Sequence, residues 1–234
     1  MALFKRLAPL REYLSTQLQQ EVKLETARDF PEFARRTAAR QYDVVLTAPH
    51  MAIPPVDAGT YLLVATYVNP LKAVIVVADS SPLVSLKDLV GKRIGTPPKQ
   101  AIITMVGQQY LKSEGVLDHV STRLSAYRSH NAVYSAALAG EVDAALIADI
   151  IYNKAKKQNV PLRKIAESEA FPGAGLLLAA DLAPDLRERI SKAFIGLKAS
   201  EQGRAILKNI SQPGYVAADI AQFKNLRPFV LIQK

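Results

Sequence analysis

The chain has 234 residues, of which 49% are hydrophobic and 22% are charged. This balance is typical of a folded protein with one large domain or two lobes of about 100 residues each. The absence of cysteine excludes disulfides, thiolate zinc sites, iron–sulfur clusters and a cysteine nucleophile. The net charge of +9 favours anionic partners. The basic residues are scattered and Trp is absent, so no nucleic-acid partner is expected.

No hydrophobic run in the sequence is long enough to span a bilayer. The longest runs, residues 73–78 and 174–180, have the length of strands, whereas a spanning helix needs about 20 residues. No continuous apolar stretch follows Lys5 and Arg6, so the sequence shows no signal peptide. We therefore expect either a cytosolic protein or the mature or excised part of an exported one.

Hydrophobic periodicity predicts the elements of the first part of the chain. Leucines spaced by three and four residues predict a helix over residues 3–18, and alternation predicts a strand over residues 21–25. Asp29 is the expected N-cap of a short helix over residues 31–40. Strands are predicted at 43–46, 62–66 and 73–78, with Thr47-Ala-Pro-His50 as the loop that ends the first of them.

The rest of the chain alternates short strands with helices. Strands are predicted at residues 92–96, 121–124, 142–147, 162–165 and 175–180. Helices are predicted at residues 85–91, 102–113, 131–138, 150–157, 184–200 and 201–209. This alternation predicts an α/β fold with mixed, mostly parallel sheets.

The residue patterns of the common enzyme and metal sites are missing. The three histidines, at positions 50, 119 and 130, lie far apart in the sequence, and no zinc-protease pattern is present. The chain also lacks a serine nucleophile elbow, a phosphate-binding P-loop and a dinucleotide fingerprint. We therefore expect no catalytic residues, no metal and no cofactor.

Polar residues follow several of the predicted strands. In open α/β sheets, ligands bind at the carboxyl ends of strands, where helix N-termini offer free N–H groups. The candidates at such positions are Thr47, His50, Thr96, Thr104, Ser129, His130 and Asp149. Most have a structural explanation as well: a cap for His50, Ser129 and Asp149, a turn for Thr96 and Thr104, and an exposed helix turn for His130.

Several of these segments occur in the order seen in a known family. The sequence resembles the solute-binding proteins of phosphonate- and phosphate-type ABC transporters along nearly its whole length. The segments that carry the resemblance are Asp43-Val-Val-Leu-Thr-Ala-Pro-His50, Ala73-Val-Ile-Val-Val-Ala-Asp79, Leu86-Lys-Asp-Leu-Val-Gly-Lys-Arg93, Ser129-His-Asn-Ala132, Leu138-Ala-Gly-Glu-Val-Asp-Ala144, Ala166-Glu-Ser168, Pro172-Gly173 and Asp181-Leu-Ala-Pro184.

The resemblance implies a two-lobed periplasmic-binding-protein fold of type II. Lobe one would comprise residues 1–76 plus 172–234, and lobe two residues 77–171, with crossing strands near 73–79 and 171–178. Family members begin with a strand before the first helix, whereas this chain starts almost at the helix. That strand is therefore expected to be missing, displaced, or supplied by the strand-like tail at residues 229–232.

The resemblance also implies an anion-binding helix start in lobe two. The Ser-Thr-Ser-Gly run with which family members bind phosphonate falls here on Ala101-Ile-Ile-Thr104, so most of its hydroxyl donors are absent. Each lost hydrogen bond to a buried anion costs roughly 1–3 kcal/mol. Lys72 is a candidate to replace those donors with a charge; alternatively, a less polar ligand contacts Ile102 and Ile103.

We therefore expect an extracytoplasmic, monomeric solute-binding protein that captures a small anionic or zwitterionic ligand between two lobes for ABC-transporter uptake. Its partner would be a transporter permease or a membrane signalling protein, and its location periplasmic. The alternatives are the sensor domain of a membrane histidine kinase or cyclase and an enzyme on a similar fold. A transcription-regulator effector domain would need an upstream DNA-binding helix-turn-helix, which this sequence lacks.

Overall fold

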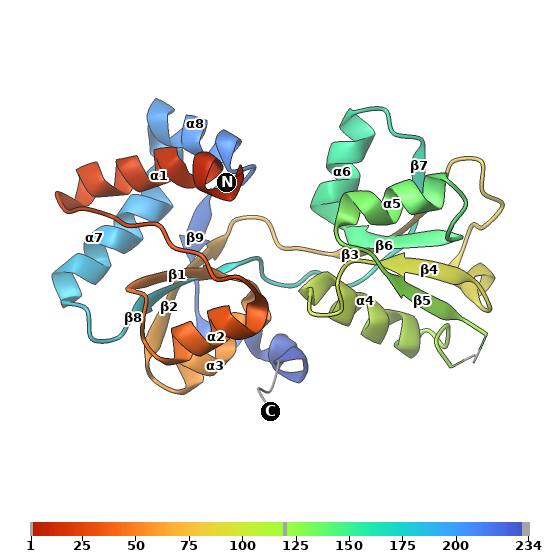
Figure 1. The fold of residues 1–234 in the computed structure, drawn as a ribbon, viewed down its shortest axis with the longest axis horizontal. Coiled ribbons are helices and arrows are strands. Elements are labelled where there is room, and N and C mark those ends of the chain that lie inside the picture. The colour runs from red at the N-terminus through yellow and green to blue at the C-terminus, as the bar shows by residue number, and fades with distance from the viewer. Residues whose placement is uncertain (1, 119–120, 231–234) are drawn as a thin grey trace. The chain divides into compact units, whose positions relative to one another are not determined.

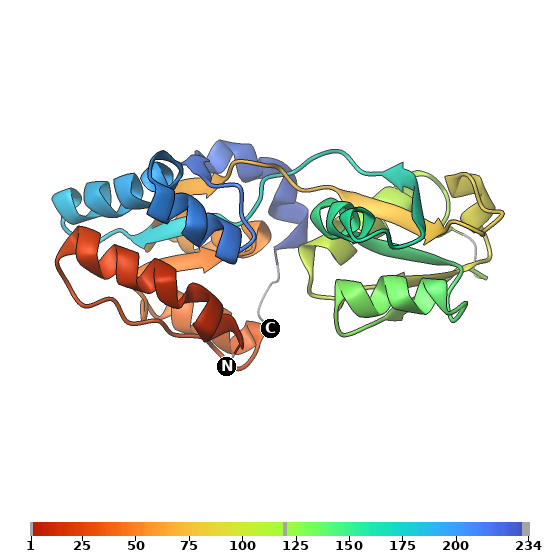
Figure 2. The same ribbon diagram turned by 90° about the horizontal axis from the view of Figure 1, so that it is seen from above.

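The computed structural model describes residues 2–118 and 121–230. The chain divides into two compact units: Met1–Pro70 with Pro172–Lys234 form unit 1, and Leu71–Phe171 form unit 2. The chain passes between them twice, before β3 and before β8 (Figures 1 and 2). The sequence predicts the first boundary at residues 76/77. The structure places it earlier because β3 (Ala73–Ala78) pairs with two strands of unit 2 along its length.

Unit 1 is a four-stranded sheet with helices on both faces (Figure 1). Its elements are α1 (Ala2–Leu18), α2 (Phe30–Ala38), β1 (Val44–Thr47), α3 (Pro49–Asp57), β2 (Tyr61–Tyr67), β8 (Gly175–Ala179), α7 (Pro184–Ile195), η2 (Gly196–Ala199), α8 (Glu201–Asn209), β9 (Tyr215–Ala217) and η3 (Ile220–Phe229).

The strand order in unit 1 is β1-β8-β2-β9, and each neighbouring pair is antiparallel. The fully buried β8 directs Leu176 and Leu178 into a core that contains Leu10 and Leu14 of α1 and Phe194 of α7. The leucine periodicity of residues 3–18 thus correctly predicted a helix with an apolar face.

Unit 2 is a five-stranded sheet between helices. Its elements are β3, η1 (Leu86–Leu89), β4 (Arg93–Thr96), α4 (Ile102–Ser113), β5 (Arg123–Ala126), α5 (His130–Leu138), β6 (Ala144–Ala148), α6 (Asp149–Lys157) and β7 (Leu162–Glu167). The strand order is β5-β4-β6-β3-β7. Strand β4 is parallel to β5 and β6, whereas β3 is antiparallel to β6 and β7.

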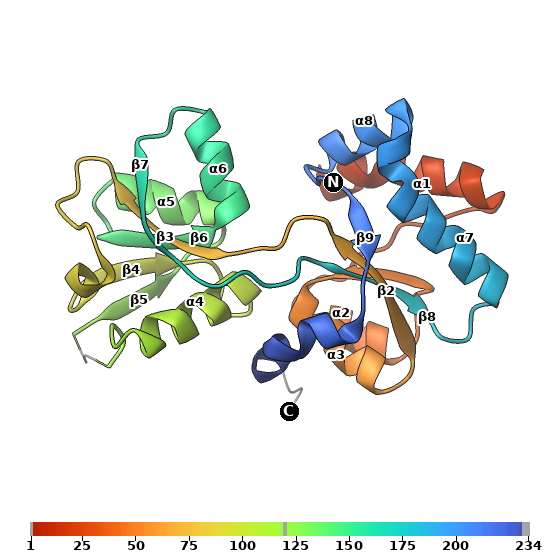
Figure 3. The same ribbon diagram turned by 180° about the vertical axis from the view of Figure 1, so that it is seen from behind.

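The alternation of side chains along β6 separates the two helical layers of unit 2. Ala145 and Ile147 pack in the core cluster with Val133 of α5. Leu146 points the other way, toward Gly107 of α4, where an added Cβ would lie 2.4 Å from its methyl groups. A strand turns successive side chains to opposite faces. Accordingly, α5 and α6 cover one face and α4 the other (Figure 3).

The expectation of mixed sheets is met in unit 2, but the expectation that they are mostly parallel was wrong. Among the strand pairs of the described residues, only β4–β5 and β4–β6 are parallel. Strands β3 and β8 each follow a passage between the units and insert antiparallel between two strands of the unit they enter. Hydrophobic periodicity reports which faces are buried but not the direction of the neighbouring strand.

Three local predictions also differ from the structure, and two elements were not predicted. Residues 21–25 half-bury Val22 and Leu24, but they form no strand and belong to no sheet of the described chain. Helix α3 replaces the loop expected at Thr47-Ala-Pro-His50, because Pro49 opens a helix despite two later prolines. No sequence pattern predicted β9 or η3. A strand was predicted at residues 229–232. Phe229 is instead the last residue of η3, and residues 231 and 232 lie outside the described residues.

Candidate ligand-binding site

The sheet of unit 2 brings its polar candidate residues to one edge. Strands β4, β5, β6 and β7 all end there and β3 begins there, because β3 runs opposite to its neighbours. We call this the carboxyl edge of unit 2. Thr96 ends β4, Asp149 follows β6, Glu167 ends β7 and Lys72 precedes β3. The topology therefore gathers residues that lie up to 95 positions apart in the sequence.

His130 is held in a defined orientation at this edge. Ser129 caps α5 by accepting the N–H of Ala132 at 3.2 Å, as predicted for an N-cap serine. Nδ1 of His130, the first residue of α5, accepts the N–H of Ala148 at 3.3 Å. Burial lowers the pKa of His130, which favours the neutral ring. Since Nδ1 is the acceptor, the neutral ring carries its proton on Nε2, which is then a hydrogen-bond donor.

Asp149 and Lys72 connect β6 to β3. The backbone N–H of Asp149 donates to the carbonyl of Lys72 at 3.0 Å. The backbone N–H of Lys72 donates to Oδ1 of Asp149 at 3.1 Å. This reciprocal pair fixes the Asp149 carboxylate at the carboxyl edge and leaves its second oxygen as a potential acceptor.

The charge of Lys72 is directed to a carboxylate. Its ammonium group forms an ion pair with Glu167, which also binds Lys164 at 2.5 Å. Lys164 and Lys72 together lower the pKa of Glu167 to about 2. The lysine proposed to supply a free positive charge therefore already has an anionic partner. Sequence reasoning missed Glu167, although Ala166-Glu-Ser168 is one of the segments that carry the family resemblance.

Thr96 and Thr104 use their hydroxyl protons within unit 2. Both side chains are fully enclosed, and both hydroxyls donate to the carbonyl of Pro97, at 3.0 and 3.1 Å. They brace the loop between β4 and α4. Helix α4 begins at Ile102 without a side-chain cap, so its start offers backbone N–H groups and no hydroxyl donor.

In unit 1, the side chains of Thr47 and His50 are buried and have no hydrogen-bond partner in the part of the chain that the structure describes. Thr47 ends β1, opposite Gly175 of β8. His50 lies in the first turn of α3 with no exposed surface. Among the described residues, the Thr47 hydroxyl and both His50 ring nitrogens lack a partner. Burial lowers the pKa of His50 to about 4, so the ring is neutral at pH 7. Buried polar groups without partners are costly, which singles this turn out as a place where a bound molecule would supply hydrogen bonds.

The fold defines the class of the protein. Two α/β units, each of which receives an antiparallel strand directly after a chain crossing, form the architecture of type II periplasmic binding proteins. The chain belongs to the family described as "ABC transporter, phosphonate, periplasmic substrate-binding protein", whose model matches residues 1–223. The family resemblance seen in the sequence is thereby confirmed.

Solved structures show the same fold. PhnD1 from Prochlorococcus marinus, in complex with methylphosphonate, superposes with a TM-score of 0.83 at 18% identity, over 97% of this chain and 92% of that one. A phosphonate-transporter binding protein from Pseudomonas aeruginosa has a TM-score of 0.78 at 18% identity, and the match covers 97% of this chain and 80% of that one. The aliphatic sulphonate binding protein SsuA from Escherichia coli has a TM-score of 0.68 at 17% identity, and the match covers 97% of this chain and 88% of that one. No curated protein sequence matches the chain.

Membership of this family establishes a substrate-binding component of an ABC transporter rather than an enzyme. It also implies an extracytoplasmic location. The sensor-domain and enzyme alternatives gain no support from the family or the similar structures. Within residues 2–118 and 121–230, no helix has both the length and the apolarity needed to cross a membrane.

Proposed function

We propose that the protein binds a small phosphonate-type oxyanion and delivers it, as a periplasmic monomer, to the permease of an ABC transporter. The observation that carries the proposal is the orientation of His130. Its Nδ1 is occupied by the Ala148 amide, so the neutral ring offers Nε2–H as a donor at the carboxyl edge of unit 2. Family membership supplies the phosphonate class of ligand.

The anionic group of the ligand would be bound mainly by neutral donors. The starts of α4 and α5 each offer N–H groups that have no partner within their own helix. The positive end of each helix dipole favours an anion there. His130 adds a side-chain donor beside the start of α5, while the ammonium group of Lys72 stays with Glu167. Because the polar groups of Lys72, Thr96 and Thr104 already bind Glu167 and the Pro97 carbonyl, we assign these three residues the role of supporting the site.

Asp149 would extend the proposed site to zwitterionic ligands. One of its oxygens accepts a hydrogen bond from the Lys72 backbone N–H, and the second would accept a hydrogen bond from an ammonium group of the ligand. An aminoalkylphosphonate carries both charges, so its phosphonate would bind the helix starts and His130, and its ammonium group Asp149. This gives an aminoalkylphosphonate one more contact than methylphosphonate.

We further propose that Thr47 and His50 of unit 1 are ligand-binding residues. Their buried polar atoms have no partner in the described chain, and a ligand oxygen or hydroxyl would satisfy them. Because the His50 ring is neutral at pH 7, it would act as a hydrogen-bonding group rather than as a cation.

A thermal-shift panel tests the proposal. The purified chain is heated with methylphosphonate, 2-aminoethylphosphonate, phosphate, phosphite, methanesulfonate and acetate. A ligand at 100 times its dissociation constant stabilises the folded state by about 2.7 kcal/mol. A protein of this size gains roughly 2–4 °C per kcal/mol, so a shift of about 5–10 °C is expected for the phosphonates. Shifts confined to methanesulfonate or acetate would refute the phosphonate assignment, and a flat panel would refute the proposed site.

A further inference from the structure

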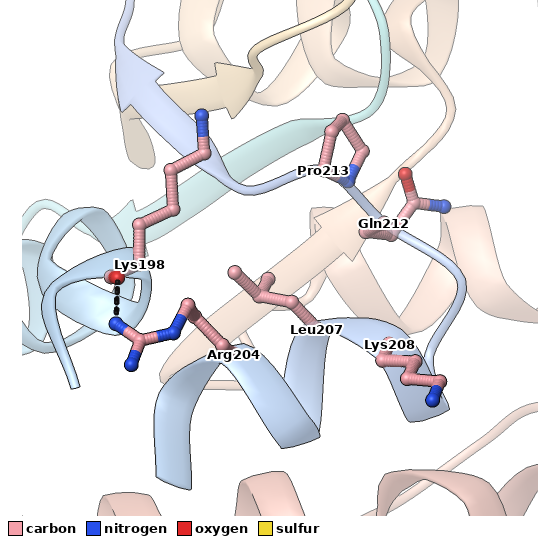
Figure 4. Close-up of a pocket in the computed structure, with 6 residues that line it drawn as sticks. All are labelled: Lys198, Arg204, Leu207, Lys208, Gln212 and Pro213. Carbon is pink, nitrogen blue, oxygen red and sulfur yellow. Dashed lines mark hydrogen bonds between the residues drawn. The ribbon is translucent and has the colours of Figure 1, made fainter. Parts of the chain in front are cut away.

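A basic hollow lies in unit 1 among η2, α8 and the segment that leads to β9 (Figure 4). Its volume is about 470 Å³. It is lined by Lys198, Arg204, Leu207, Lys208, Gln212 and Pro213. None of these lining residues is acidic. The residues proposed above to bind the ligand lie in other segments of the chain, so the hollow is a separate feature.

Two glycines build this hollow. At Gly203, an added Cβ would lie 1.9 Å from the carbonyl oxygen of Leu197, so α8 approaches the η2 backbone as closely as only glycine permits. At Gly214, where φ is +125°, an added Cβ would lie 2.4 Å from Cε of Lys198. The aliphatic part of Lys198 therefore lies directly over Gly214. The hollow thus depends on specific backbone geometry.

The cationic groups of the hollow are not neutralised by the rest of the described chain. Within residues 2–118 and 121–230, no carboxylate forms an ion pair with Lys198, Arg204 or Lys208. One guanidinium nitrogen of Arg204 donates to the carbonyl of Lys198 at 3.1 Å (Figure 4). This bond positions the guanidinium group while its other N–H groups can bind an acceptor, and a guanidinium fork matches a carboxylate.

We infer that this hollow is a docking surface for an acidic, extended segment of a partner protein. Charge complementarity selects carboxylates as the groups that face Lys198, Arg204 and Lys208. Leu207 is only 4% exposed, so the apolar floor that the hollow offers to a side chain of the segment comes from half-buried Pro213 and the aliphatic part of Lys198. A single inorganic oxyanion would leave that floor and much of the volume unused, and a bilayer presents a flat array of head groups that does not enter a hollow.

A peptide-binding experiment tests this inference. The probe is a capped five-residue peptide with a central leucine flanked on each side by two glutamates. It is titrated into the 15N-labelled chain at 50 mM NaCl. We expect saturable changes in the amide signals of Lys198, Arg204 and Gln212. We also expect at least tenfold weaker binding by the combined variant Lys198→Gln, Arg204→Gln, Lys208→Gln. A matched variant, Lys112→Gln, Lys154→Gln, Lys157→Gln, removes the same charge from α4 and α6 of unit 2 and should bind within twofold of the unsubstituted chain.

Three other probes distinguish an acidic peptide from other occupants of the hollow: a glutamine peptide, inorganic pyrophosphate and anionic vesicles. A peptide with glutamines in place of the glutamates should not bind. If inorganic pyrophosphate shifts the same amides and the acidic peptide does not, the hollow is a small-anion site and the inference is wrong. The inference is also wrong if anionic phosphatidylglycerol vesicles bind through the hollow and the peptide does not. The same holds if both combined variants weaken peptide binding equally, or if the peptide shows no saturable binding. Should the combined variant unfold, Lys208→Glu alone, at an exposed position of α8, must still weaken peptide binding.

The inference stands apart from the proposed ligand function. The combined hollow variant should retain the thermal shift with methylphosphonate, because its three residues lie in η2 and α8 and none belongs to the proposed ligand site. Failure of the peptide experiment therefore leaves the ligand proposal untouched. Conversely, a flat ligand panel leaves the docking inference untouched.

Discussion

The backbone N–H of Ala148, at the end of β6, donates to Nδ1 of His130, at the start of α5, across 3.3 Å. This bond ties the first turn of α5 to the carboxyl edge of unit 2 and determines which ring nitrogen carries the proton. In the proposed site, His130 would therefore donate a hydrogen bond to the anion as a neutral ring rather than as a cation.

Replacement of His130 should weaken phosphonate binding. The variant His130→Ala removes the Nε2–H donor, and a hydrogen bond to a charged group contributes about 1.5–3 kcal/mol. We therefore expect roughly a 10- to 100-fold higher dissociation constant for methylphosphonate by isothermal titration calorimetry. Ser135→Ala, on the exposed part of the same helix, is the control and should leave affinity unchanged. Unchanged affinity in His130→Ala would remove His130 from the site.

Burial of His50 should make stability depend on pH. Burial lowers the pKa of His50 from 6.5 to about 4, so between these values the unfolded chain binds a proton that the folded chain does not. Stability then rises with pH across this window and is lost as pH falls from about 6.5 toward 4. Urea unfolding at pH 7 and pH 5 should show a loss of about 2 kcal/mol at the lower pH.

The variant His50→Leu separates this effect from other titrating groups. It should lose less stability than the unsubstituted protein between pH 7 and pH 5. The pKa of Glu167 is lowered to about 2, so this carboxylate changes the stability of the protein mainly below pH 4.5. It therefore does not affect the comparison between pH 7 and pH 5. An identical pH dependence in His50→Leu and in the unsubstituted protein would show that His50 is not the group responsible.

Glu167→Gln should change ligand affinity more than stability. The ion pairs of Glu167 with Lys72 and Lys164 are about one-third exposed, and such pairs contribute under about 1 kcal/mol. The substitution frees the charge of Lys72 beside the proposed anion site, so affinity for methylphosphonate should rise several-fold at low salt and less at high salt. Lys164→Gln is the comparison, because it leaves Lys72 paired. Weaker binding in Glu167→Gln would contradict this assignment.

Gly107→Val should destabilise unit 2. A Cβ at this position would lie 2.4 Å from the methyl groups of Leu146, and overpacking of this kind costs about 1–3 kcal/mol. We expect a lower midpoint in thermal unfolding. The matched variant Gly196→Ala, where a Cβ would meet nothing within 4 Å and the backbone is right-handed helical, should be neutral or stabilising by up to about 1 kcal/mol. Equal midpoints for the two variants would contradict the close packing of α4 on β6.

Local sequence signals were sufficient for most of the secondary structure. The bounds predicted for β3 and α4 match the structure residue by residue, because an uninterrupted β-branched run and a helical period ended by a glycine are local signals. The caps at Asp29 and Ser129 were likewise predicted correctly. The order of the family segments along the chain was distinctive enough to indicate the family from the sequence alone.

The candidate site was only partly accessible from sequence. Its positions at strand ends could be predicted, since ligand sites of open α/β sheets lie there. Sequence could not show that the Thr96 and Thr104 hydroxyls bind the Pro97 carbonyl, nor that Lys72 pairs with Glu167, 95 residues away. Whether a polar side chain is free or already bonded depends on neighbours that the chain brings in from elsewhere.

The sequence by itself determined most helices and strands, the α/β class and the family, because each depends on residues within a short window or on the order of such windows. Only the tertiary structure decided that β3 and β8 insert antiparallel, that His130 bonds to the end of β6, and that His50 is enclosed without a partner among the described residues. These features arise from contacts between segments distant in the chain. Their energies depend on pairing and burial, which no local pattern encodes.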